Sequence, residues 1–118
     1  MVKTDDPYLE SGELLILTTD RVRINTVQYD VLLTTRHLIL VDTHHTRFQP
    51  KMYPLISIQS VKGGKTANGE LVISLFFDET TSETPGPMVL VYSQQPGEHR
   101  KSERDEWIKK LMRLIVSA

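Results

Sequence analysis

The sequence predicts a mainly β domain with one α-helix: a partly open barrel of six to seven antiparallel strands, arranged as two orthogonal sheets and capped by a C-terminal helix. Most of the chain alternates apolar and polar residues, as half-buried strands do. Residues 102–116 instead show the only clear helical period. Short links between successive strands favour antiparallel pairing, and barrel closure removes the bare edge and the uncovered apolar face of an open sheet.

Length and composition indicate one globular domain. At 118 residues the chain buries a sizeable core, and we expect a lead-in at residues 1–12 and the domain at residues 13–118. The absence of cysteine and of a charged-then-apolar leader favours a reducing, cytoplasmic setting. The apolar runs are far shorter than the roughly 20 residues of a membrane-spanning helix. A net charge of -1 argues against a nucleic-acid partner.

Six stretches carry the strand pattern. Asp20 and Arg21 interrupt the first stretch, which predicts either a bent strand or two short ones. Pro50 and Pro54 limit the donation of ladder hydrogen bonds, so the strand that follows them is expected near a sheet edge. Residues 62–69, KGGKTANG, are expected to form a glycine-rich basic turn. The predicted strands are residues 13–24, 27–33, 37–41, 55–61, 70–78 and 88–93.

The predicted helix, residues 102–116, has one apolar face. Ser102 is expected to cap its start by accepting a hydrogen bond from the amide of Asp105, whose carboxylate reaches back in a shortened capping box. A lone helix of about four turns is marginal in water, so the apolar face must pack on the strands. The core anchors on this face are Trp107, Ile108, Leu111, Leu114 and Ile115.

Four short sequence motifs resemble those of the pleckstrin-homology-like superfamily, in particular its bacterial pleckstrin-homology, GRAM and GLUE-type branches. The resemblance implies a PH-like barrel and a non-catalytic module that recruits its host protein to membrane phosphoinositides or to another protein. In lipid-binding members the headgroup sits among basic residues of the first two strands, where this chain offers only Arg21 and Arg23. The carrying stretches are Gly12-Glu13, LLTTRHLILVD at 32–42, YPLISIQSV at 53–61 and ERDEWIKKL at 103–111.

A set of basic residues forms the candidate ligand or anion site. If the hairpin ends converge, these residues make an anion-attracting rim, and Gly63 and Gly64 let backbone amides approach a phosphate. The more ordinary interpretation is solvated loop charge, which keeps a surface soluble. The set is Arg21, Arg23, Arg36, His37, His44, His45, Arg47, Lys51, Lys62 and Lys65.

Metal, cofactor and catalytic sites are not predicted. His44 and His45 lack a third ligand at suitable spacing, although imidazoles also serve as pH-sensitive charges. The sequence contains neither Gly-x-Ser-x-Gly nor a Gly-x-x-x-x-Gly-Lys phosphate loop. An enzyme would need the fold to bring His37, His44 or His99 beside a nucleophile.

Two functions of different classes therefore stay open. The first is binding of a protein or peptide partner, or self-association, through a strand edge bearing Pro50 and Pro54 or through the groove between the helix and a neighbouring strand. The second is peripheral binding to anionic lipid headgroups, at the inner face of the membrane, through the basic set. The second function requires that set to share one face of the domain.

Overall fold

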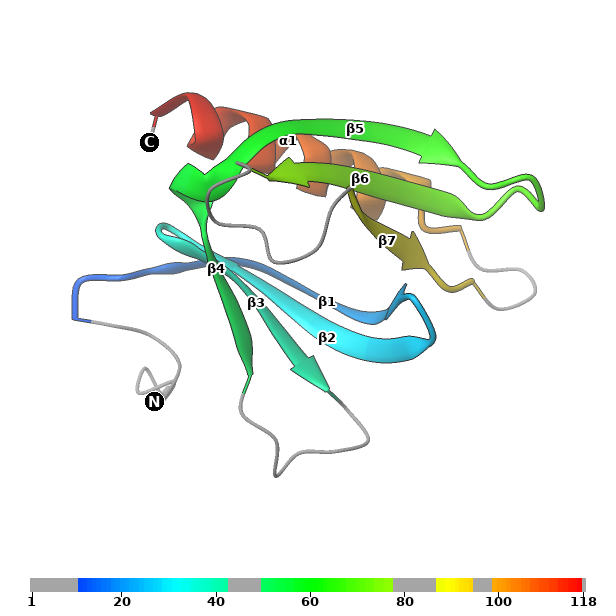
Figure 1. The fold of residues 1–118 in the computed structure, drawn as a ribbon, viewed down its shortest axis with the longest axis horizontal. Helices are drawn as coiled ribbons and strands as arrows, with labels where there is room; N and C mark the ends of the chain where they lie inside the picture. The colour runs from blue at the N-terminus through cyan, green and yellow to red at the C-terminus, as the bar shows by residue number, and fades with distance from the viewer. Residues whose placement is uncertain (1–10, 43–49, 78–86, 95–98, 118) are drawn as a thin grey trace.

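The computed structural model describes residues 11–42, 50–77, 87–94 and 99–117 (Figure 1). Within them the chain forms seven strands, one 3-10 turn and one C-terminal helix. The elements are β1 (Leu15–Ile24), β2 (Val27–Thr34), β3 (His37–Asp42), β4 (Lys51–Pro54), η1 (Leu55–Ser57), β5 (Ile58–Lys65), β6 (Leu71–Phe77), β7 (Met88–Tyr92) and α1 (Lys101–Ser117).

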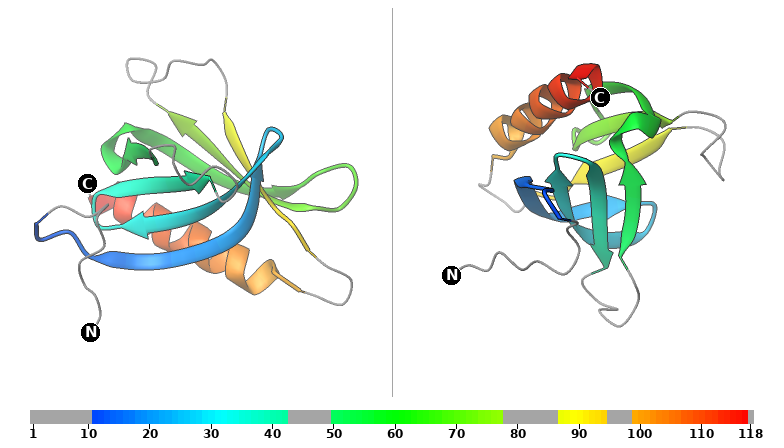
Figure 2. Two further views of the ribbon diagram at one scale, coloured as in Figure 1. Left: turned by 90° about the horizontal axis from the view of Figure 1, so that it is seen from below. Right: turned by 90° about the vertical axis from the view of Figure 1, so that its left-hand side faces the viewer.

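All strand pairs are antiparallel, and the strand order is β4-β3-β2-β1-β7-β6-β5. The first strand pairs with the last, since Val22 lies opposite Tyr92 and Arg23 opposite Val91. Figure 2 shows the sheet bending so that its two halves face each other across the core. The described structure confirms the predicted partly open barrel with a single capping helix.

β1 is one bent strand, the first of the two predicted alternatives. Its register against β2 shifts between Thr19 and Val22. Arg21 has a φ of 53°, a left-handed conformation that side chains rarely adopt, so the bend is concentrated at this residue. The bend lets β1 pair along its length with β2 and, near its end, with β7.

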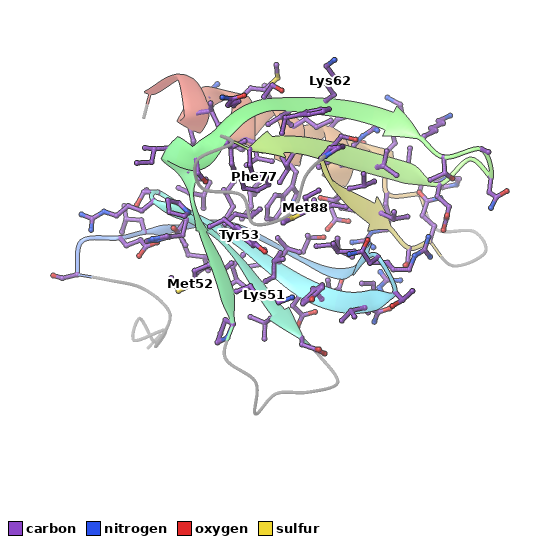
Figure 3. The ribbon with its side chains drawn as sticks, viewed as in Figure 1. Lys51, Met52, Tyr53, Lys62, Phe77 and Met88 are labelled. Atoms are coloured by element: carbon purple, nitrogen blue, oxygen red, sulfur yellow. The ribbon has the colours of Figure 1, made fainter. Side chains whose placement is uncertain are left out.

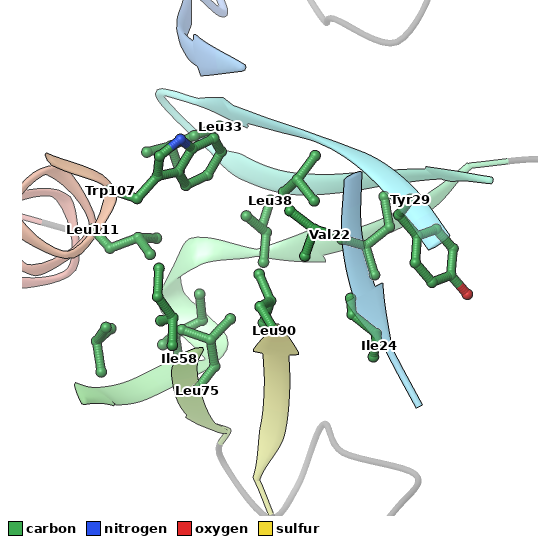
Figure 4. Close-up of a cluster of buried hydrophobic side chains, with 14 of the residues drawn as sticks. Val22, Ile24, Tyr29, Leu33, Leu38, Ile58, Leu75, Leu90, Trp107 and Leu111 are labelled. Atoms are coloured by element: carbon green, nitrogen blue, oxygen red, sulfur yellow. The ribbon is translucent and has the colours of Figure 1, made fainter. Parts of the chain in front are cut away.

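The core lies between the two halves of the sheet and under α1 (Figure 4). Trp107 and Leu111 are almost fully buried in it. Ile108, Leu114 and Ile115 are partly buried and pack against the same cluster. The two ends of the sheet, β4 and β5, form no ladder with each other. On this side of the barrel, Tyr53 of β4 packs against Phe77 of β6, with ring centroids 5.3 Å apart.

The helix begins differently from the prediction. The carbonyl of Arg100 accepts the amide of Arg104 at 2.9 Å, so Arg100 occupies the capping position and Ser102 lies inside the first turn. The carboxylate of Asp105 accepts bonds from Lys101 Nζ and Arg104 Nε, each at 2.9 Å. The predicted capping box is therefore wrong, because Asp105 pairs with cations and the helix starts earlier.

The region after β4 also differs from the prediction. Leu55–Ser57, expected as strand, form η1, where Ser57 Oγ donates to the carbonyl of Pro54 at 2.6 Å. β5 then runs through both glycines to Lys65, so the expected turn at 62–69 shrinks to the residues after Thr66. The turn closes at Gly69, with a φ of 85° that suits glycine.

A buried arginine ties the helix start to the barrel. The side chain of Arg100 is 2% exposed, and its guanidinium carbon lies 4.8 Å from the ring centroid of Tyr92. All five of its N–H donors are used. Nε donates to Glu103 at 2.9 Å; Nη1 donates to the carbonyls of Arg21 and Ser93 at 3.2 and 2.9 Å; Nη2 donates to Thr19 Oγ1 and the carbonyl of Asp20 at 2.8 and 2.7 Å.

Candidate functional site

The structure does not bring the described members of the predicted basic rim together. Arg23 of β1 lies opposite Gln28, near the start of β2, whereas Arg36 and His37 follow the end of that strand. The eight residues of β2 separate these groups by about 23 Å at the usual rise of a strand. The arginines of the first strand and the basic residues of the β2–β3 turn therefore lie at opposite ends of the barrel.

The first-strand arginines have carboxylate neighbours. Arg23 Nη2 lies 3.0 Å from Glu70 Oε1, and both side chains are partly exposed. Arg21 Nε lies 3.7 Å from Asp20 Oδ1. These pairs offset the positive charge at the end of the barrel where the resemblance places a headgroup.

His37 belongs to a polar cluster at the start of the barrel. Its Nδ1 lies 2.9 Å from Oε2 of Glu13, whose side chain is fully buried. The same carboxylate accepts a hydrogen bond from the hydroxyl of Thr34. Thr34 is itself completely buried, so its hydroxyl is not presented to a substrate, and the cluster holds the start of β1 against the β2–β3 turn.

The lysines of the two outermost strands, Lys51 on β4 and Lys62 on β5, also lie apart. Figure 3 shows Lys62 beyond β5 and Lys51 on β4, on opposite sides of the domain. Lys51 Nζ donates to Tyr29 Oη at 3.2 Å, and this hydrogen bond raises the pKa of Lys51 above its ordinary 10.5. Lys62 Nζ lies 5.6 Å from the ring centroid of Phe76, a cation–π distance.

The other predicted site residues complete this distribution. Lys65 ends β5, while His44, His45 and Arg47 lie outside the described residues. No group of three histidine, aspartate or glutamate side chains suited to a metal occurs in the described part of the chain. Nor is any described helix long and apolar enough to cross a membrane.

Gly63 and Gly64 serve a different purpose from the predicted phosphate turn. Both lie within β5, opposite Ile73 and Val72 of β6. A Cβ at Gly63 would lie 2.6 Å from Ile108 Cδ1, so the glycine allows α1 to approach the strand closely. Arg104 Nη1 holds the helix there by donating to the carbonyls of Gly64 and Val72, at 2.8 and 3.1 Å.

The two outermost strands, β4 and β5, differ in the backbone groups that they offer. On β4 the amide of Leu55 bonds the carbonyl of Arg36 at 2.9 Å, which sets the alternation of the ladder. The groups of Tyr53 and Lys51 then point towards β3, and those of Met52 and Pro54 point outwards. Since proline has no N–H, Met52 supplies the only outward amide of this strand.

β5 offers a longer run. The amide of Thr66 bonds the carbonyl of Glu70 at 2.8 Å, so in the same ladder Lys62 and Gly64 point their backbone groups towards β6. The N–H and C=O groups of Val61, Gly63 and Lys65 therefore point away from β6. β5 is last in the strand order, so no described strand pairs with these groups.

Exposed apolar side chains lie on the two elements that adjoin β5, η1 and α1. η1, which leads directly into β5, presents Ile56 with 78% exposure. α1 packs against both β5 and η1, and Met112 on this helix is 51% exposed. We call the outward groups of Val61, Gly63 and Lys65, with the exposed side chains of Ile56 and Met112, the β5 edge site.

Sequence reasoning selected Lys62 and Lys65 but assigned them to a turn and missed the outward backbone groups of β5. The hairpin sequence Thr66-Ala67-Asn68-Gly69 contains a signal from which the orientation of these backbone groups can be predicted. A three-residue hairpin loop with glycine in the left-handed position sets Thr66 opposite Glu70, and that pairing determines which groups of β5 point outwards.

A curved antiparallel barrel capped by one C-terminal helix is the pleckstrin-homology-like fold, which confirms the resemblance suggested by the sequence. No protein-family model matches the sequence, and no curated protein matches it. Solved structures do match. The Vps36 N-terminal PH domain superimposes with a TM-score of 0.67 at 15% identity, over 92% of this chain and 86% of that one.

A pleckstrin homology domain from Shewanella amazonensis SB2B superimposes with a TM-score of 0.54 at 19% identity, over 93% of this chain and 90% of that one. Identities this low establish the fold alone.

Proposed function

We propose that this domain is a non-catalytic interaction module that binds an extended segment of a protein partner as an added strand beside β5. The observation that supports this proposal is the run of outward N–H and C=O groups at Val61, Gly63 and Lys65. Main-chain hydrogen bonds of this kind supply affinity in strand addition, and neighbouring side chains supply specificity.

The β4 edge supports this function less well. Pro50 and Pro54 lack the backbone N–H that would donate to an added strand. The carbonyl of Pro54 already accepts a hydrogen bond from the hydroxyl of Ser57. Of the two outermost strands, β5, which contacts the helix, therefore supports strand addition better than β4. Flanking prolines of this kind are a common protection of a sheet edge.

Binding to anionic lipid headgroups has weaker support. That function requires the basic residues to share one face, and Arg23, Arg36, Lys51 and Lys62 are separated in the described structure. A salt-dependent co-sedimentation with anionic vesicles, lost on reversing Lys62 but kept on reversing Lys51, would favour it after all. The cytoplasmic location stays a prediction from the composition.

The test is to select peptides from a random decapeptide library displayed on phage, with the full chain as bait, and to map where they bind. We expect bound peptides to slow hydrogen exchange at the amides of Val61, Gly63 and Lys65. Lys65→Pro removes one outward N–H and leaves the β6 ladder intact, whereas Lys65→Ala removes only the side chain. Equal binding by these two variants, or protection confined to other strands, would contradict strand addition.

A further inference from the structure

The charge of the β5 edge site has one sign. The strand reads IQSVKGGK and contains no acidic residue. Lys62 and Lys65 are both exposed, and Gly63 and Gly64 between them carry no side chain. A strand added here would meet two ammonium groups and an otherwise open backbone.

Three carboxylates on α1 or next to β6 are already paired with other cations. Asp105 of α1 lies 2.9 Å from both Lys101 and Arg104. Glu103 lies 2.9 Å from Arg100, and Glu70 lies 3.0 Å from Arg23. None of these described acids forms an ion pair with Lys62 or Lys65, so the positive charge of the edge is available to a partner.

A second copy of this chain fits the edge poorly. Two β5 strands paired antiparallel about Lys62 or about Lys65 would place that lysine directly opposite its own copy, and a pair centred on the glycines would still bring four lysines and no carboxylate into one strand pair. Like charges directly opposite each other destabilise a strand pair. Lysine on an edge strand commonly prevents this association, and the same charge favours a strand that carries carboxylates.

We infer that the segment bound at the β5 edge site is acidic, with carboxylates facing Lys62 and Lys65, and is not a second copy of this chain. This inference rests on the proposed function. The two lysines are three positions apart, so their side chains lie on opposite faces of the strand. The partner therefore carries acidic residues about three positions apart, one on each face of the added strand.

The composition of the selected decapeptides tests this inference. We expect enrichment in aspartate and glutamate over the input library, and binding that weakens as salt is raised. Lys62→Glu with Lys65→Glu should weaken binding of a selected acidic peptide by about tenfold or more and should shift a new selection towards lysine and arginine. Lys51→Glu, on the other side of the domain, is the matched control and should leave binding within about twofold.

Two further measurements keep the result unambiguous. Thermal unfolding of each variant shows whether it is folded, and Lys62→Gln with Lys65→Gln should give an intermediate loss of binding. Peptides that protect the β5 amides but show no acidic enrichment would overturn this inference and leave the proposed function intact. Failure to select any peptide that maps to β5 would overturn both this inference and the proposed function. A dimer that is abolished by Lys65→Pro but not by Lys65→Ala would overturn the exclusion of a second copy.

Discussion

Replacing Arg100 with lysine tests how the helix is joined to the barrel. The arginine side chain is 2% exposed, and its five donors reach a carboxylate, a hydroxyl and three backbone carbonyls. Lysine keeps the positive charge but concentrates its three donors on one atom. It cannot reach acceptors on β1, after β7 and on α1 together, so at least two buried acceptors lose their partner.

The expected loss of stability follows from these contacts. A hydrogen bond to a charged group contributes about 1.5–3 kcal/mol, and an orphaned buried acceptor costs about 1–3 kcal/mol. Allowing for the donors that lysine keeps, Arg100→Lys should lower the free energy of unfolding by about 2–3 kcal/mol. Arg100→Met, which leaves Glu103 without its cation, should lower it by about 3–5 kcal/mol.

Urea unfolding followed by fluorescence measures this loss, because the single tryptophan, Trp107, is buried in the core. Arg23→Lys is the matched control: the Arg23 side chain is 40% exposed and pairs with Glu70, so the change should cost less than about 1 kcal/mol. If Arg100→Lys were no more destabilising than Arg23→Lys, the guanidinium network would not hold the helix to the barrel.

Three further predictions concern α1 and its contacts. Gly63→Ala should lower the free energy of unfolding by about 1–2 kcal/mol, because its Cβ would come within 2.6 Å of a helix side chain. Gly64→Ala, whose Cβ would have its nearest contact at 3.7 Å, should be neutral or stabilising. Equal urea midpoints for the two variants would contradict this prediction. Leu111→Ala should cost about 2–5 kcal/mol and Met112→Ala, half exposed, less than about 0.5 kcal/mol; a reversed order would mean that the helix presents its other face. Burial by itself raises the pKa of Glu103, but hydrogen bonds from Arg100 and Thr19 outweigh it and hold the pKa below the ordinary 4.5. The unfolded chain therefore binds a proton first, and stability should fall as the pH drops below 4.5 towards the folded-state pKa; Glu103→Gln should remove that part of the fall in a urea–pH series.

The prediction of helix and strands from sequence succeeded where the determining interactions are local. The spacing of Trp107 and Leu111 places both on one helical face whatever the helix packs against, and both are buried. The polar pair Asp20-Arg21 marks the bend of β1, since an interruption of the alternation is visible in the sequence alone. Pro50 and Pro54 likewise placed the following strand at an edge, where β5 lies.

The missed roles of Gly63 and Arg100 have a common physical cause, which is contact between segments far apart in the chain. The sequence predicts a turn at Gly63 because its neighbours include glycine, lysine and asparagine, but its role depends on a helix more than 40 residues later. Arg100 lies in a polar linker with no sequence feature that predicts burial. Its partners come from β1, the end of β7 and α1, and only the folded barrel brings them within hydrogen-bond reach.

The candidate site divides in the same way. Residue types alone identified Lys62 and Lys65, because two lysines that flank a glycine pair stand out in the sequence. The Thr66–Glu70 pairing determines which backbone groups of β5 point outwards. The strand order determines that β5 lies at the end of the sheet. Local periodicity thus determined the elements, whereas register and the packing of α1 on β5, which are long-range properties, determined the surface that this domain offers a partner.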